Sequence, residues 1–187
     1  MSVQLLRRLF TVDQYYKMLE AGVFTENERV ELIRGEIVKM SPMGIRHSAS
    51  VKCLAELFIL RLAQTVTVGI QDPVRLNNTS EPQPDISLLQ RRPDFYETRH
   101  PQPEDVFLLI EVSDTTIKYD REIKVPLYAE NNIVEVWLVN LTEECLEVYR
   151  KPTANGYKIV QTFQRGETVT IQALPHITFT VDEILGD

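Results

Sequence analysis

The run VFLLIEV, residues 106–112, decides the fold, because it is apolar at every position except the sixth. A strand with one solvated face alternates apolar and polar residues, whereas a nearly continuous apolar run is typical of a strand buried on both faces. A second run of this kind, VEVWLV, occupies residues 134–139, and its Trp137 is expected in the core. The sequence therefore predicts central strands with other elements packed on both sides.

The segments around these two strands predict a mixed β-sheet flanked by helices, in the α/β or α+β class. Apolar residues spaced three and four apart predict helices over the following ranges: 11–22, 47–63 and 120–131. Pro126 leaves the start of the third helix uncertain by several residues. Further strands are expected over residues 29–33, 36–40, 65–70, 84–89, 145–149, 157–163 and 168–171, with C-terminal β-hairpins around Asn155-Gly156 and a helical turn over 181–185.

Composition and charge limit the classes of function. The 187 residues are 43% hydrophobic and 25% charged, which predicts one globular domain spanning residues 1–187. The net charge of −7 excludes a histone-like coat for nucleic acid. The chain has no apolar run of membrane-spanning length, and residues 1–8 lack a secretion signal. We therefore expect a cytoplasmic protein that does not associate with a membrane. Cys53 and Cys145 are expected to be buried free thiols.

Two acids stand at the ends of predicted strands. Asp85 follows a proline at the start of the strand over 84–89, and Glu111 ends the apolar run over 106–112. A carboxylate at the edge of an apolar strand is costly unless a cation compensates it, and either a divalent metal or a salt bridge would do so. Lys118 and Lys124 follow closely. Carboxylates that hold Mg²⁺ and a lysine near the attacking water are the parts that phosphodiester hydrolysis needs.

Several segments together resemble a known family. These segments are VELIRGEIVKMSP (30–42), QPDISLL (83–89), LLIEVSDTT (108–116) and YDREIKVPLYAENNIVEVWLVN (119–140). Their order and spacing resemble the PD-(D/E)XK nuclease superfamily and, more narrowly, the Uma-two family of restriction-endonuclease-like proteins, over roughly residues 10 to 180. The resemblance implies a restriction-endonuclease-like fold.

The resemblance also implies roles for individual residues. Asp85 and Glu111 would bind Mg²⁺, for which Mn²⁺ would substitute, with help from the backbone carbonyl of Val112. The superfamily usually has a lysine two residues after the second acid, but this chain has Ser113 there. The lysine of the following helix, Lys124, would then be the catalytic one. Lys118 is its competitor, because it is closer in sequence.

Supporting roles are less specific. Glu31 matches an early glutamate of the family, and it is either a third carboxylate of the site or a surface residue paired with Arg29 or Arg34. His47 matches a histidine at the start of the family's long helix. It would contact phosphate or shape the site, although a structural role carries more weight. Gln71 either lines the site from a neighbouring strand or is solvated, and we favour the solvated interpretation.

Other polar residues are given structural interpretations. Asp120 is expected to be the N-cap of the helix over 120–131. The basic stretch with Arg91, Arg92 and Arg99 is expected to be a solvated loop, with phosphate contacts as the alternative.

The sequence hypothesis is a Mg²⁺-dependent endonuclease that cleaves DNA. One alternative is a non-catalytic nucleic-acid-binding or assembly module that retains the fold, which Ser113 and the acidic charge favour. Another is a different metal-dependent phosphodiesterase. A homodimer is a further expectation, because cleaving two strands invites two sites and symmetric dimers are the commonest assemblies.

Overall fold

The structure is a computed structural model that describes residues 6–25, 28–62 and 64–186. Residues 1–5, which belong to the segment predicted to lack a secretion signal, lie outside the described residues, as does Ala63 at the end of the helix predicted over 47–63. No helix in the described residues is long and apolar enough to cross a membrane.

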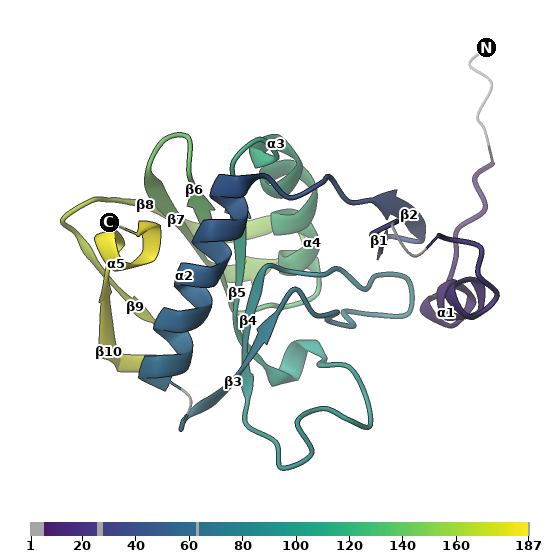
Figure 1. Cartoon of the computed structure of the whole chain (residues 1–187), viewed down its shortest axis with the longest axis horizontal. Helices are drawn as coiled ribbons and strands as arrows, with labels where there is room; N and C mark the ends of the chain where they lie inside the picture. The colour runs from purple at the N-terminus through teal and green to yellow at the C-terminus, as the bar shows by residue number, and fades with distance from the viewer. Residues whose placement is uncertain (1–5, 26–27, 63, 187) are drawn as a thin grey trace.

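A six-stranded sheet runs through the molecule in the order β3-β4-β5-β6-β7-β8 (Figure 1). Its strands are β3 (Val66–Ile70), β4 (Ile86–Gln90), β5 (Val106–Ser113), β6 (Glu135–Asn140), β7 (Cys145–Thr153) and β8 (Gly156–Gln164). β5 and β6 are parallel and the other neighbours are antiparallel, so the prediction of a mixed sheet is confirmed.

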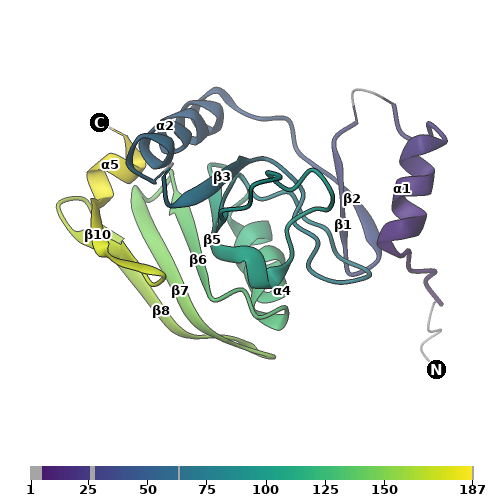
Figure 2. The same ribbon diagram turned by 90° about the horizontal axis from the view of Figure 1, so that it is seen from below.

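Helices cover both faces of the sheet. α2 (Ile45–Leu62) and α5 (Val181–Leu185) lie on one face, and α4 (Val125–Glu130) lies on the other (Figure 2). Leu108 and Ile110 of β5 belong to the hydrophobic cluster under α2, whereas Leu109 belongs to the cluster under α4. Trp137 is fully buried, as predicted, and its ring contacts Phe58 and Phe179. The apolar run of β5 is therefore buried on both faces.

The N-terminal part forms its own layer beside the sheet (Figure 1). α1 (Val12–Glu20) begins with a capping box in which Thr11 and Gln14 bond to each other's backbone N–H. It packs on the hairpin of β1 (Val30–Ile33) and β2 (Glu36–Lys39). Arg34 and Gly35 join the two strands with positive φ angles of 48° and 79°, as a two-residue hairpin turn requires.

The helix predicted over 120–131 starts earlier and is irregular. It consists of α3 (Ile117–Tyr119), a π-helical segment η2 (Asp120–Lys124) and α4. Asp120 is therefore inside the helix and the N-cap prediction is wrong, since Thr116 occupies that position. Pro126 is the second residue of α4, just after the π segment, and so lies inside the helix, where a proline cannot donate a backbone hydrogen bond and disturbs regular helical geometry.

The C-terminal part contains the predicted hairpins and one strand that was missed. β7 and β8 form one hairpin, and β9 (Thr168–Ile171) pairs with β10 (Leu174–Thr180) in another. β10 was not predicted, because Pro175 and His176 interrupt its apolar pattern. A short 3₁₀ helix, η1 (Pro103–Asp105), precedes β5.

Two predictions about individual side chains are corrected. Cys53 is half-buried, although Cys145 is buried and both thiols are free as expected. The loop before η1 is not simply solvated, because Arg92 pairs with Asp94 at 2.8 Å and Arg99 pairs with the buried Asp105. These arginines therefore stabilise the loop rather than present free charge.

Candidate functional site

The sheet register brings the two predicted acids together. Ile86 pairs with Ile110 in the antiparallel β4–β5 ladder, so Asp85 precedes β4 at the same end of the sheet where Glu111 lies on β5. Both carboxylates line a cavity of about 390 Å³ and are buried, with exposed fractions of 8% and 3%. Asp85 and Glu111 therefore lie in the same cavity, as the resemblance implies.

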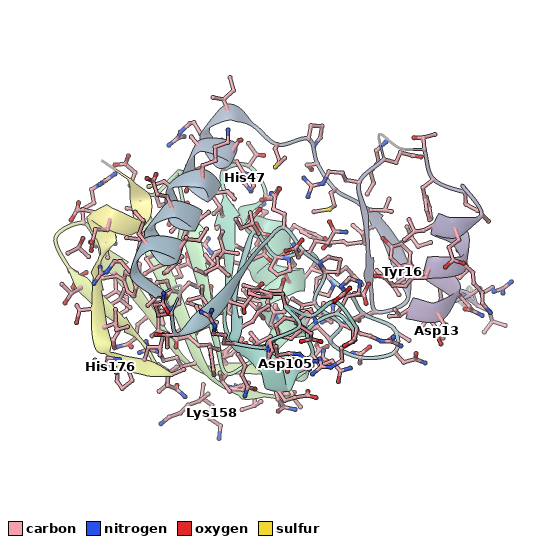
Figure 3. The ribbon with its side chains drawn as sticks, turned by 60° about the horizontal axis from the view of Figure 1, so that its bottom comes forward. Asp13, Tyr16, His47, Asp105, Lys158 and His176 are labelled. Carbon is pink, nitrogen blue, oxygen red and sulfur yellow. The ribbon has the colours of Figure 1, made fainter. Side chains whose placement is uncertain are left out.

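Asp85 is held by three donors. His47 Nε2 and the Val112 backbone N–H lie 3.0 and 2.9 Å from its Oδ2, and Gln71 Nε2 donates to its Oδ1 at 3.0 Å. His47 lies in the first turn of α2 (Figure 3). The interpretation of Gln71 as solvated is wrong. Its positive φ of 55°, at the end of β3, accompanies the contact of its side chain with Asp85.

Glu111 is bound by two side chains of the helix that follows β5. Lys124 Nζ lies 3.1 Å from Glu111 Oε1, and Tyr128 donates its phenolic hydrogen to the same carboxylate. Both side chains are buried. Lys118, the competing lysine, is exposed and does not line the cavity. The structure therefore brings Lys124, and not Lys118, to the two acids.

Glu31 faces the same cavity rather than the surface. It is 1% exposed, and its Oε2 lies 3.5 Å from Lys124 Nζ. Tyr119 donates to its Oε1 at 3.2 Å, and the Gln83 backbone N–H donates to its Oε2 at 3.0 Å. The alternative of a surface residue paired with Arg29 or Arg34 is thus not observed, and Arg34 pairs with Glu130 instead.

A fourth buried carboxylate was missed as a site residue. Asp120 is 4% exposed and lines the cavity. Its Oδ2 accepts hydrogen bonds from the hydroxyls of Ser113 and Thr116, the latter at 2.8 Å. A signal was present in the sequence, since Asp120, Lys124 and Tyr128 are spaced four apart and so share one side of a helix.

The cavity holds more negative than positive charge. Burial opposes the charge on Lys124, yet the surrounding carboxylates, Glu111 first, raise its pKa far above the ordinary value. Burial raises the pKa of Glu111 well above its usual range, and Asp120 and Asp85 raise it further, against the effect of Lys124. Lys124 is therefore a charged ammonium, whereas Glu111 binds a proton more readily than a free carboxylate does.

Asp85 and His47 form a polarised pair. Burial alone would raise the pKa of Asp85, but hydrogen bonds from His47, Gln71 and Val112 lower it. The bond to Asp85 raises the pKa of His47, against the effect of burial. Asp85 therefore loses its proton more readily than a free aspartic acid does.

Basic side chains border the mouth of the cavity. Arg29 and Lys39 line it from the β1–β2 layer. Most arginines form an ion pair with an aspartate or glutamate, but Arg29, which is half-buried, makes none within the described residues. Arg29 also lies close enough to His47 to oppose its protonation. An unpaired guanidinium beside buried acids is available to an anionic ligand.

A second group of metal-compatible side chains lies elsewhere. Among the described residues, Glu143, Cys145 and Glu147 have donor atoms within 4.8 Å of one another. However, Glu147 already accepts hydrogen bonds from Arg121 and Tyr149. Its charge is compensated without a metal, so this group is a weaker candidate than the cavity.

Comparisons with known proteins identify the family and the fold of this chain. The model of the Uma2 family, described as "Putative restriction endonuclease", matches residues 12–182. A solved structure described as a putative nuclease belonging to DUF820, from Anabaena variabilis ATCC 29413, has the same fold with a TM-score of 0.69 at 15% identity. The similarity covers 94% of this chain and 97% of that one. No curated protein matches this chain.

Proposed function

The chain belongs to the Uma2 family, and from this premise we propose that it is a metal-dependent endonuclease that hydrolyses phosphodiester bonds in DNA. The observation that carries the proposal is the meeting of Asp85, Glu111 and Lys124 in one cavity. These residues come from three separate elements, namely the start of β4, β5 and the helix after β5. They are brought together by the tertiary fold and not by the local structure of any one element. Perturbed titratable groups in a cleft are typical of a functional site.

The donor set fits a divalent cation such as Mg²⁺ or Mn²⁺. Four buried acids line the cavity, and Lys124 is its only buried basic side chain among the described residues. Their oxygens are the hard ligands that Mg²⁺ prefers, and a bound cation would offset the excess negative charge. Asp85, Glu111 and the carbonyl of Val112 would hold the metal. When bound, the metal would polarise the scissile phosphate and lower the pKa of a bound water.

The chain's own residues would orient the reaction. Lys124, a charged ammonium, is suited to stabilise negative charge on the phosphate rather than to accept a proton. Tyr128 fixes Glu111, and the His47–Asp85 hydrogen bond fixes the second carboxylate. Glu31 is a second carboxylate in contact with Lys124, since its Oε2 lies 3.5 Å from Lys124 Nζ. We assign supporting roles to Glu31 and His47 on these contacts, and no role to the exposed Lys118.

The test is cleavage of supercoiled plasmid and of single-stranded DNA with Mg²⁺, with Mn²⁺ and with EDTA. We expect cleavage that needs the metal and is lost in Asp85→Ala and Glu111→Ala. Glu143→Ala, an acid of the other metal-compatible group, is the matched control and should cleave like the wild type. Equal activity in all four proteins would assign the cleavage to a contaminant or to another site.

Two alternatives are separated by the same assay. A non-catalytic binding or assembly module, which Ser113 at the usual lysine position favours, would bind DNA without cleaving it. Another metal-dependent phosphodiesterase would cleave RNA or small phosphodiesters in preference to DNA, so the substrates should include both. The homodimer stays a prediction, which the molar mass in solution by light scattering would test.

A further inference from the structure

The end of β5 and the helix that follows it are connected by a set of buried hydroxyl–carboxylate bonds. Ser113 and Thr116 both donate to Asp120 Oδ2, and Ser113 is fully buried. Ser113 is the last residue of β5, Thr116 is the N-cap position of α3, and Asp120 begins the π-helical segment. We call these three residues the β5–helix connection. It fixes where the helix starts relative to Glu111.

The π-helical segment sets which side chains of the helix reach the cavity. The Val125 backbone N–H donates to the carbonyl of Asp120, five residues earlier, so the turn holds one residue more than an α-helical turn. Asp120 and Lys124 are the first and last residues of this segment, and both are buried in the cavity. Such π turns inside helices occur frequently at functional sites, where they re-aim side chains.

The position of Ser113 explains why this arrangement matters. Successive residues of a strand point to opposite faces, so Ser113 shares the face of Glu111. A lysine at this position would carry its ammonium on the strand itself. In this chain the ammonium comes from Lys124, on a separate element whose placement depends on its own contacts. Lys124 needs an anchor that a strand lysine does not need.

We propose that Asp120 is the positioning residue for Lys124, acting through its hydrogen bonds to Ser113 and Thr116. The connection holds the helix so that Lys124 Nζ lies 3.1 Å from Glu111 and 3.5 Å from Glu31. Ser113, which stands where the superfamily usually has a lysine, thereby helps to position Lys124 through Asp120. This inference rests on the proposed function for its effect on catalysis, but its effect on the placement of Lys124 can be measured without any activity.

The first test is labelling of lysines by acetic anhydride, followed by mass spectrometry, well below the melting temperature. In the wild type we expect Lys124, with a 5% exposed side chain, to be protected, and the exposed Lys118 to be labelled. In Asp120→Ala the ratio of Lys124 to Lys118 labelling should rise severalfold. In Asp120→Asn, which keeps an oxygen acceptor, it should rise less. An unchanged ratio in a folded Asp120→Ala protein would overturn the proposal, whether or not the chain is a nuclease.

The second test is a double-mutant cycle on the DNA cleavage rate at saturating substrate. Asp120→Ala should lower kcat by roughly tenfold or more, because small misplacements of catalytic groups have effects of this size, with KM little changed. If Asp120 acts through Lys124, the double variant with Lys124→Ala should be no slower than Lys124→Ala alone. Multiplicative losses would overturn the positioning role. If the wild type shows no metal-dependent cleavage, the proposed function is refuted instead. The labelling test then decides whether Asp120 positions Lys124.

Discussion

The buried carboxylates of two regions of this protein are compensated differently. On β6 and β7, Glu135 accepts hydrogen bonds from Arg150 and Trp137, and Glu147 accepts them from Arg121. Each of these acids has an arginine of its own. In the cavity, by contrast, Lys124 is the only buried basic side chain among the described residues, and it pairs with Glu31 and Glu111. The other two buried acids there, Asp85 and Asp120, accept hydrogen bonds from His47 and from Ser113 instead.

The difference separates structural acids from candidate catalytic acids. The charge of a paired buried carboxylate is compensated within the fold, and removing one partner of such a pair is strongly destabilising because the other charge stays buried alone. An unbalanced group of carboxylates destabilises the fold by mutual repulsion, and it persists where a ligand or a reaction needs it. Binding of a cation would therefore stabilise the protein more in the cavity than in the paired region.

The largest expected effect is on catalysis by the shared lysine. Lys124→Ala should lower kcat by about 10²–10³-fold, because a charge donor aimed at the transition state is lost from a buried site. Lys118→Ala should leave kcat unchanged, since this side chain is exposed and outside the cavity. Single-turnover plasmid cleavage measures both. An equal loss in the two variants would contradict the assignment of Lys124.

The second effect is on stability in the paired region. Glu135→Ala should lower the free energy of unfolding by about 3–5 kcal/mol, because it leaves Arg150 without its partner in a buried site. The Gln172 N–H, 2.6 Å from Glu135, and the Trp137 indole lose their acceptor as well. Urea unfolding measures the change. A loss below about 1 kcal/mol would mean that this acid is not a structural one.

The third effect has the opposite sign and depends on pH. Glu111→Gln should stabilise the metal-free protein by about 1 kcal/mol or more at pH 8, since it removes one of the repelling charges. Because the pKa of Glu111 is raised in the folded state, the wild type loses stability as the pH rises from the unfolded value of 4.5 through the folded pKa. The two proteins should therefore have equal pH dependence below 4.5 and diverge above it. Melting curves from pH 4 to 9 test this, and a less stable Glu111→Gln at pH 8 would contradict it.

The smallest effect is on binding at the mouth of the cavity. Arg29→Ala should weaken DNA binding several-fold and reduce the slope of log K against log salt by about 1, because one phosphate contact is lost. Arg34→Ala is the matched control, since Arg34 already pairs with Glu130. Fluorescence anisotropy at several salt concentrations, with Ca²⁺ in place of Mg²⁺, separates the two. An unchanged slope for Arg29→Ala would exclude it from the DNA-binding surface.

The predictions from the sequence that held rest on periodicity for the strands and on the family resemblance for the meeting of the two acids. The apolar runs at 106–112 and 134–139 identified the buried strands, whereas the resemblance implied that Asp85 and Glu111 would lie together. Alternation and strand direction are local properties of a sequence. They are sufficient to place residues whose side chains project directly from the sheet.

The missed features depend on tertiary contacts. Gln71 reaches Asp85 through a positive φ, which no propensity of glutamine predicts. Asp120 was taken for an N-cap, but the helix begins earlier, with Thr116 at that position, and the π turn that starts at Asp120 has no pattern in the sequence. Glu31 remained ambiguous, since its partner Lys124 is 93 positions away and lies on another element. Each of these residues is positioned by a neighbour that is distant in sequence.

The most direct test of the central claim is a crystal of the wild type soaked with Mn²⁺ and measured at the manganese absorption edge. The account predicts an anomalous peak in the cavity, bound by oxygens of Asp85 and Glu111 at about 2.1 Å, as hard divalent cations are. A peak confined to Glu143 and Glu147, or no peak at all at saturating manganese, would contradict it.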